Sequence, residues 1–312
     1  MFDAVVDFAK KAVLDRRVQA VAGLVVACKV ISTLKAASAR NKFFAEVKKQ
    51  QKGVLHIYGP PRVAPGTPNF QPWVAKIEAF ARLNKIPYVI HFGMDFVAYS
   101  PTETVPFIAL DGELVGDSEA IIEFLSKKFN SSLDAKLTKE QVAIRTTLRR
   151  TLEHSMMPHS YRLNMVDNVQ VMVGLFSKVV SMPGFVVKMA INQYRKGTIK
   201  RLNASGIGDM SDAVYTEEYT RDIKAIEGLI GDKKFIFGAE PTSIDLAIYP
   251  HLAFMTSAQG HTKNTQPLEF LRGSKIIQEY IKRCEQTIFP DLGKIVPCKA
   301  GEQSFLTYPI TA

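Results

Sequence analysis

The stretch TVPFIALDGELVGDSEAIIEFL, from Thr104 to Leu125, decides the fold. Within it, Asp111-Gly112 joins the apolar run FIAL to the short segment ELV. Because Asp-Gly readily adopts the positive φ angles of a two-residue hairpin turn, the two runs are predicted to pair as antiparallel strands. Asp117-Ser118 then predicts a capped helix start, followed by apolar residues at helical spacing. The stretch predicts a β-hairpin that leads directly into a helix.

The residues before this stretch supply the other elements of an α/β domain. Val54 to Tyr58 (VLHIY) and Tyr88 to Phe92 (YVIHF) are short β-rich runs, predicted to be strands. Between them lie a proline-rich loop and a helix that starts at Pro72, a position where proline is tolerated. The predicted order is β-α-β-(α)-β-β-α, a thioredoxin-like arrangement.

The residues after the polar link at 130–132 show no convincing strand alternation, so an all-helical domain is predicted there. Thr138 and Gln141 have the spacing of a capping box. Thr242 and Asp245 have it as well, ahead of the apolar run SIDLAIYPHLAFM. We assign Thr242 and Asp245 a structural role, because a capping box satisfies N–H groups at a helix end.

The N-terminal arm carries most of the charge. Eleven basic and four acidic residues lie between Met1 and Lys52, which accounts for +7 of the net +10. The remaining +3 is no basis for a nucleic-acid-binding face. The apolar run over 18–34 predicts a helix about 25 Å long, somewhat short of the ~30 Å hydrocarbon core of a bilayer. A membrane anchor and a helix packed on the protein's own surface both remain open.

Three cysteines, Cys28, Cys284 and Cys298, occur without a CxxC pair or a close His/Cys group. This predicts a reducing compartment and no metal site.

A ligand edge is predicted at the two ends of the hairpin. A cis bond at Val105-Pro106 would turn the Val105 N–H and C=O outward to pair with an extended peptide. Asp117-Ser118 offers a hydroxyl and a helix N-terminus to a ligand carboxylate, while the aspartate can hold a ligand ammonium. Each feature alone also fits a simple edge strand or helix cap.

Four segments together resemble the glutathione S-transferase superfamily, in its failed-axon and metaxin-like branch, which is also similar to cadmium-responsive nematode proteins. They are Gln71 to Tyr88, Val105 to Ser118, SGIGDMS (Ser205 to Ser211) and GDKKFIFGAEPTSIDLAIYPHLA (Gly231 to Ala253). The resemblance implies a thioredoxin-like N-terminal domain over 53–130 and an all-α domain over 135–295. The arm (1–52) and a tail (296–312) complete the chain.

The resemblance implies that glutathione or a similar small peptide is a ligand or substrate, and it implies no cofactor. Val105, turned outward by the bond to Pro106, would pair with the cysteinyl backbone, and Asp117 and Ser118 would hold the γ-glutamyl end. Relatives place Ser-Pro or Cys-Pro before the first helix, whereas this chain has Gln71-Pro72. Gln71 is therefore counted among the ligand-binding residues, since glutamine can donate a hydrogen bond to the ligand but is not a nucleophile. Tyr58 is the better substitute and Thr67 the second, although Tyr58 also fits simple packing at a strand end.

Three functions follow, and the sequence does not decide whether the protein is an enzyme. The first is a cytoplasmic module that binds a glutathione-like ligand or a partner, with its body facing the cytosol if the arm is anchored. The second is an active transferase that conjugates glutathione to electrophiles in detoxification or a stress response. The third is a metaxin-like component of a mitochondrial protein-handling complex. Homodimer formation is a further expectation, since transferase relatives often pair.

Overall fold

The computed structural model describes residues 34–63, 67–93, 95–294 and 303–306. The chain divides into two units, Met1–Gln51 and Lys52–Ala312. In the first unit, residues 34–48 are helical and largely exposed, except that Val47 is buried. The predicted apolar helix over 18–34 lies outside the described residues but for its last position. Among the helices that are described, none is long and apolar enough to cross a membrane.

The second unit contains a five-stranded mixed sheet in the order β4-β3-β1-β2-β5. Its strands are β1 (Leu55–Gly59), β2 (Tyr88–Phe92), β3 (Phe107–Leu110), β4 (Glu113–Gly116) and β5 (Gln303–Leu306). β1 and β2 are parallel, whereas β3 is antiparallel to both β1 and β4. The hairpin turns at Asp111 and Gly112, with φ angles of 55° and 85°. The predicted thioredoxin-like order of these first four strands is confirmed.

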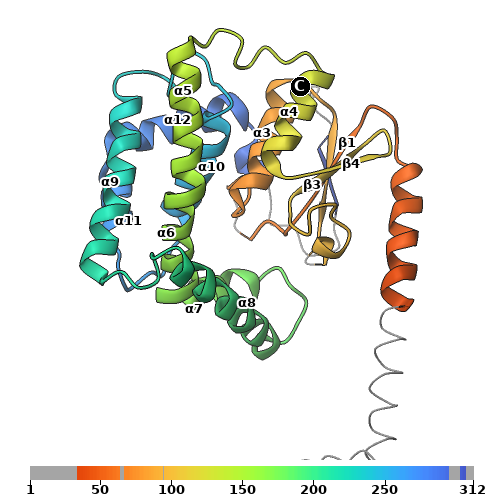
Figure 1. Cartoon of the computed structure of the whole chain (residues 1–312), viewed down its shortest axis with the longest axis horizontal. Helices are drawn as coiled ribbons and strands as arrows, with labels where there is room; N and C mark the ends of the chain where they lie inside the picture. Colours follow the sequence, from red (N-terminus) through yellow and green to blue (C-terminus); the bar gives the residue numbers. More distant parts are fainter. Residues whose placement is uncertain (1–33, 64–66, 94, 295–302, 307–312) are drawn as a thin grey trace, which may run out of the picture. The chain divides into compact units, whose positions relative to one another are not determined.

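Two helices of the α/β part, α3 (Pro72–Leu83) and α4 (Ser118–Lys128), pack against each other and against the sheet (Figure 1). α3 packs on β1, whereas α4 packs on β3 and β4, and Leu55, Ile57, Phe80 and Ile121 are all fully buried. Removing such side chains from water is the main favourable term in folding. A short 3-10 turn, η1 (Phe96–Ala98), follows β2.

The rest of the second unit is helical, as predicted, up to residue 294. Its elements are α5 (Lys139–Thr151), η2 (Leu152–Met156), α6 (Met157–Tyr161), η3 (Arg162–Asp167), α7 (Val169–Phe176), α8 (Gly184–Ala204), α9 (Asp212–Ile230), α10 (Asp245–Ser257), α11 (Gln266–Gly273), α12 (Lys275–Ile288) and η4 (Leu292–Lys294). The Thr138 capping box is complete, and Gly231 caps α9 with a φ of 52°. α10 packs on α3 and joins the helical part to the sheet part.

Two features differ from the sequence prediction. First, α5 continues through π-helical turns at η2 and η3, which keeps the helical path unbroken over 139–167. Second, β5 comes from the tail and pairs antiparallel with β2, from Tyr88↔Leu306 to His91↔Gln303. The prediction of no strand after residue 130 was therefore wrong for 303–306. A four-residue strand gives no clear alternation in the sequence, and it forms by pairing with an edge that already exists.

Candidate functional site

The predicted site residues come from elements that meet at one end of the sheet. The Val105-Pro106 peptide bond is cis and leads into β3 at Phe107. Phe107 is paired with Tyr58 of β1 on one side and with Gly116 of β4 on the other. Asp117 follows Gly116 directly, so the two ends of the hairpin lie in register. The fold thus brings together residues that are up to 59 positions apart in the sequence, between Tyr58 and Asp117.

Gln71 links this sheet end to the first helix. Its side-chain oxygen accepts a hydrogen bond from the Val74 N–H at 3.0 Å, which caps α3, and its Nε2 donates to the Val105 carbonyl at 3.2 Å. The amide therefore holds one of the two backbone groups assigned to an incoming peptide. A carbonyl oxygen has two lone pairs, so this contact leaves one acceptor position for a ligand.

Asp117 is an exposed residue and caps α4. Its Oδ1 accepts from the N–H groups of Glu119 at 2.9 Å and Ala120 at 3.1 Å, and its φ angle is 65°. In the described part of the chain, the Ser118 hydroxyl has no hydrogen-bond partner. A capped helix N-terminus with an unengaged hydroxyl beside it can receive an anionic group.

Tyr58 lies in an aromatic stack on the sheet. Its ring is stacked on Phe107 at 4.7 Å and on His91 at 4.5 Å between centroids, and Phe96 meets it edge-on at 5.2 Å. Only 3% of Tyr58 is exposed. Thr67, the second substitute for a nucleophile, is buried as well, at 5%. The stack provides the packing role considered for Tyr58 from the sequence.

A histidine pair next to Tyr58 was missed by the sequence reasoning. The His56 Nδ1 and His91 Nε2 atoms lie 2.8 Å apart, in hydrogen-bond range. Burial, together with the charge of His56, lowers the pKa of His91 to about 4, and burial also lowers the pKa of His56. The two residues sit in separate runs, VLHIY and YVIHF, and only the parallel register of β1 and β2 places them together.

The helical part adds an apolar wall beside Gln71. Phe70 meets Phe176 of α7 edge-on at 5.1 Å and lies 6.1 Å from Phe254 of α10. Aromatic contacts of this kind add to the burial of apolar surface. The wall shows that the first helix starts where the sheet part and the helical part touch.

Thr242 and Asp245 are bonded to each other, but not as a reciprocal capping box. The Thr242 N–H and hydroxyl both donate to Asp245 Oδ2 at 2.8 Å, and the Asp245 N–H donates to the Thr242 backbone carbonyl at 3.1 Å. The fully buried carboxylate also accepts from the Ile236 N–H and the Tyr280 hydroxyl, each at 3.0 Å. Asp245 is thus a hub that joins three segments of the helical part.

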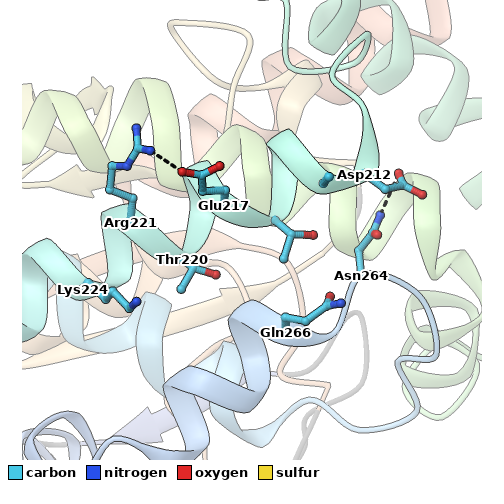
Figure 2. Close-up of a pocket in the computed structure, with 9 residues that line it drawn as sticks. Asp212, Glu217, Thr220, Arg221, Lys224, Asn264 and Gln266 are labelled. Atoms are coloured by element: carbon cyan, nitrogen blue, oxygen red, sulfur yellow. Dashed lines mark hydrogen bonds and ion pairs between the residues drawn. The ribbon is translucent and has the colours of Figure 1, made fainter.

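A separate groove of about 620 Å³ lies on the helical part, along α9 and the start of α11. Figure 2 shows two polar contacts along it: Arg221 donates to Glu217, at 2.7 Å, and the Asn264 amide donates to Asp212, at 3.2 Å. None of the predicted site residues lines it. Among the described residues, no group of three or more His, Cys, Asp or Glu side chains could hold a metal ion.

Comparisons with known proteins agree with this architecture. The profile of the glutathione S-transferase N-terminal domain matches residues 72–168, and that of the glutathione S-transferase C-terminal domain matches residues 219–284. A thioredoxin-like sheet followed by this helical domain defines the glutathione transferase fold.

Individual relatives narrow the assignment. Failed axon connections of Drosophila melanogaster is 28% identical over 85% of this chain, which spans 65% of that protein's length. The isoprene-epoxide glutathione S-transferase of Rhodococcus sp. (strain AD45) is 29% identical, covering 60% of this chain and 81% of its own. Human metaxin-2 is 21% identical over 70% of this chain and 82% of its own length. The chain belongs to the failed-axon and metaxin-like branch of the glutathione S-transferase superfamily.

Solved structures of glutathione transferases match too. That of transferase F7 from Populus trichocarpa has 12% identity and a TM-score of 0.48, covering 77% of this chain and 98% of its own.

Proposed function

We propose that this protein holds glutathione, or a similarly shaped γ-glutamyl peptide, at the sheet end and acts as a cytoplasmic binding or interaction module. Val105 and Pro106 would present the peptide edge, and Asp117 and Ser118 would hold the γ-glutamyl end. Gln71 would position the Val105 carbonyl beside the ligand. The proposal is supported by the cis Val105-Pro106 bond and the Asp117-Ser118 pair at one end of the sheet, whereas Gln71 stands where a nucleophile would be needed.

The observation that carries this proposal is the double engagement of Gln71. In a transferase that uses this position, a hydroxyl or thiol faces the sulfur of glutathione. Here the side-chain amide is committed at both ends, to the Val74 N–H and to the Val105 carbonyl. An amide in that position favours binding over conjugation.

Calorimetry with glutathione on the full chain tests the binding. The double substitution Asp117→Asn with Ser118→Ala removes the charge and the hydroxyl but keeps an oxygen that can cap α4. We expect affinity to fall about tenfold or more, because hydrogen bonds to charged groups are lost. Ser211→Ala is the matched control, since Ser211 caps α9 away from the site. Unchanged affinity in the double variant would overturn the proposal.

The alternative is an active transferase, and it is favoured by the similarity to a protein named as an isoprene-epoxide glutathione S-transferase. In that case Tyr58 would donate its hydrogen bond to the thiolate of glutathione. Conjugation of glutathione to an epoxide should then proceed in the wild type and fall in Tyr58→Phe. If the wild type turns over and Tyr58→Phe does not, the protein is an active transferase and the binding-module proposal is wrong.

The cellular setting belongs to the same proposal. We place the body in the cytosol, with the N-terminal arm as its contact to a membrane surface, and we expect two copies to pair. Fractionation of the full chain against a variant lacking 1–40 tests the arm, and equal distribution of the two would rule the contact out. Sedimentation velocity tests the dimer. A metaxin-like role in a mitochondrial complex would appear as mitochondrial recovery in the same fractionation.

A further inference from the structure

An apolar patch lies on the exposed surface at the start of α8. Monomeric proteins usually carry polar side chains on such a surface. Phe185 is 74% exposed, Met189 65%, and Met182, just before the helix, 50%. Single exposed apolar residues are normal, but three large ones within eight positions indicate a surface that binds something. The opposite side of α8 is used for folding, because Val187, Ile191 and Leu202 are buried there.

Basic residues continue the same face toward the end of the helix. Positions 185, 189, 196 and 200 are spaced by four, seven and four, which keeps them on one side of a helix with 3.6 residues per turn. Lys196 and Lys200 are exposed, as are Lys188 within the patch and Lys178 before it. The exposed face of α8 therefore passes from apolar to cationic along its length.

Negative charge is missing from this whole region of the sequence. Between Asp167 and Asp209 there are six basic residues and not one aspartate or glutamate. Nor do Lys178, Lys188, Lys196 and Lys200 form an ion pair within the described part of the chain. Fold stability does not require such a run, since surface charges are usually interspersed in sign.

We propose that this face of α8, with Met182, Phe185 and Met189 at its tip and Lys188, Lys196 and Lys200 along it, docks on an anionic lipid surface. Apolar side chains that enter the headgroup region, with lysines that reach the phosphates, are the pattern of a helix lying in a membrane interface. The exposed lysines favour a lipid surface over a protein partner, because lysine is depleted in protein interfaces. None of these residues belongs to the predicted ligand site or to the N-terminal arm.

Co-sedimentation of the full chain with phosphatidylcholine vesicles, with and without phosphatidylserine, measures the binding. Phe185→Ser with Met189→Ser is expected to lower the partition coefficient about tenfold or more. Lys196→Gln with Lys200→Gln is expected to lower it about 25-fold on the phosphatidylserine vesicles. Val214→Ser with Ile276→Ser is the control, since these residues are 47% and 37% exposed on α9 and α12.

A second measurement is specific to the position and does not depend on what the arm contributes. In Phe185→Trp, lipids brominated on the acyl chain should quench the new indole, whereas Val214→Trp should show only the quenching of the native Trp73. Quenching beyond that of the wild type in Phe185→Trp, but not in Val214→Trp, supports the proposal. Absent quenching, or serine and glutamine variants that bind as the wild type does, would overturn it. So would self-association of the wild type that Phe185→Ser abolishes without any effect on vesicles, because the face would then join copies of the chain.

Discussion

At the scale of single residues, Gln71 determines how the ligand edge is built. Glutamine is not among the preferred N-cap residues, yet its side chain is long enough to cap α3 and still reach the Val105 carbonyl. A serine or cysteine at this position is too short to make both contacts. Gln71 thus stands where relatives have a nucleophile, and it links the first helix to the start of β3.

Substitution of Gln71 separates these two contacts. Gln71→Ala should lower the free energy of unfolding by about 1 kcal/mol or more, because both the cap and the Val105 contact are lost. Gln71→Ser should recover most of the cap term, since serine caps well, but not the contact with Val105. Urea unfolding of the three proteins measures the difference. Identical midpoints for Gln71→Ala and the wild type would contradict a capping role.

At the scale of elements, buried ion pairs of Glu78 and Arg82 connect α3 to its neighbours. Glu78 is fully buried and accepts from Arg62 at 2.6 Å and from the Tyr88 hydroxyl at 2.9 Å. Arg82, also on α3, pairs with Asp291 at 2.5 Å and so ties the helix to the segment after α12. Burial, reinforced by the Glu78 carboxylate, raises the pKa of Tyr88, so its phenol stays protonated and donates.

Removal of one charge from this network should be costly. Glu78→Gln leaves two buried guanidinium groups with less compensation, so we expect a loss of about 3–5 kcal/mol in the free energy of unfolding. Glu217→Gln breaks a pair of similar length, but Glu217 is 69% exposed, so that change should stay within about 0.5 kcal/mol. Chemical denaturation compares the two. Equal losses would show that burial does not determine how much an ion pair contributes to the free energy of unfolding.

At the scale of the whole molecule, buried histidines make the fold sensitive to acid. Burial lowers the pKa of His251 in α10, of His261 and of His91 in β2 to about 4. Their folded pKa lies below the unfolded value, so the unfolded chain binds more protons between the two. The stability that these groups contribute is complete above about pH 6.5 and declines as pH falls toward 4.

His251 offers the clearest test, because it is 1% exposed and its nearest polar partner is the Tyr219 hydroxyl at 3.3 Å. Between pH 6.5 and 4.5, we expect the wild type to lose about 2–3 kcal/mol more than His251→Gln. Urea unfolding at several pH values gives this difference in slope. His154→Gln changes an exposed histidine and is the matched control. Parallel pH profiles for the wild type and His251→Gln would refute the assignment.

Local chemistry in the sequence was enough for most of the fold. Asp111-Gly112 specified the hairpin, Asp117 specified the start of α4, and Thr138 with Gln141 specified that of α5. Each depends on contacts between residues a few positions apart, which a sequence displays directly. The π-helical turns and the strand β5 were not predicted, because a short or irregular element takes its stability from neighbours distant in the chain.

The candidate site divides in the same way. The sequence by itself placed Val105, Pro106, Asp117 and Ser118 at the two ends of one hairpin, because short-range pairing alone aligns them. The contact of Gln71 with Val105, the stack around Tyr58 and the pairing of His56 with His91 were decided by tertiary structure. These contacts join residues 33 to 49 positions apart in the sequence and depend on the register of β1 with β2 and β3. That register follows from burying one face of the sheet under α3 and α4, which is a property of the whole core and not of any segment.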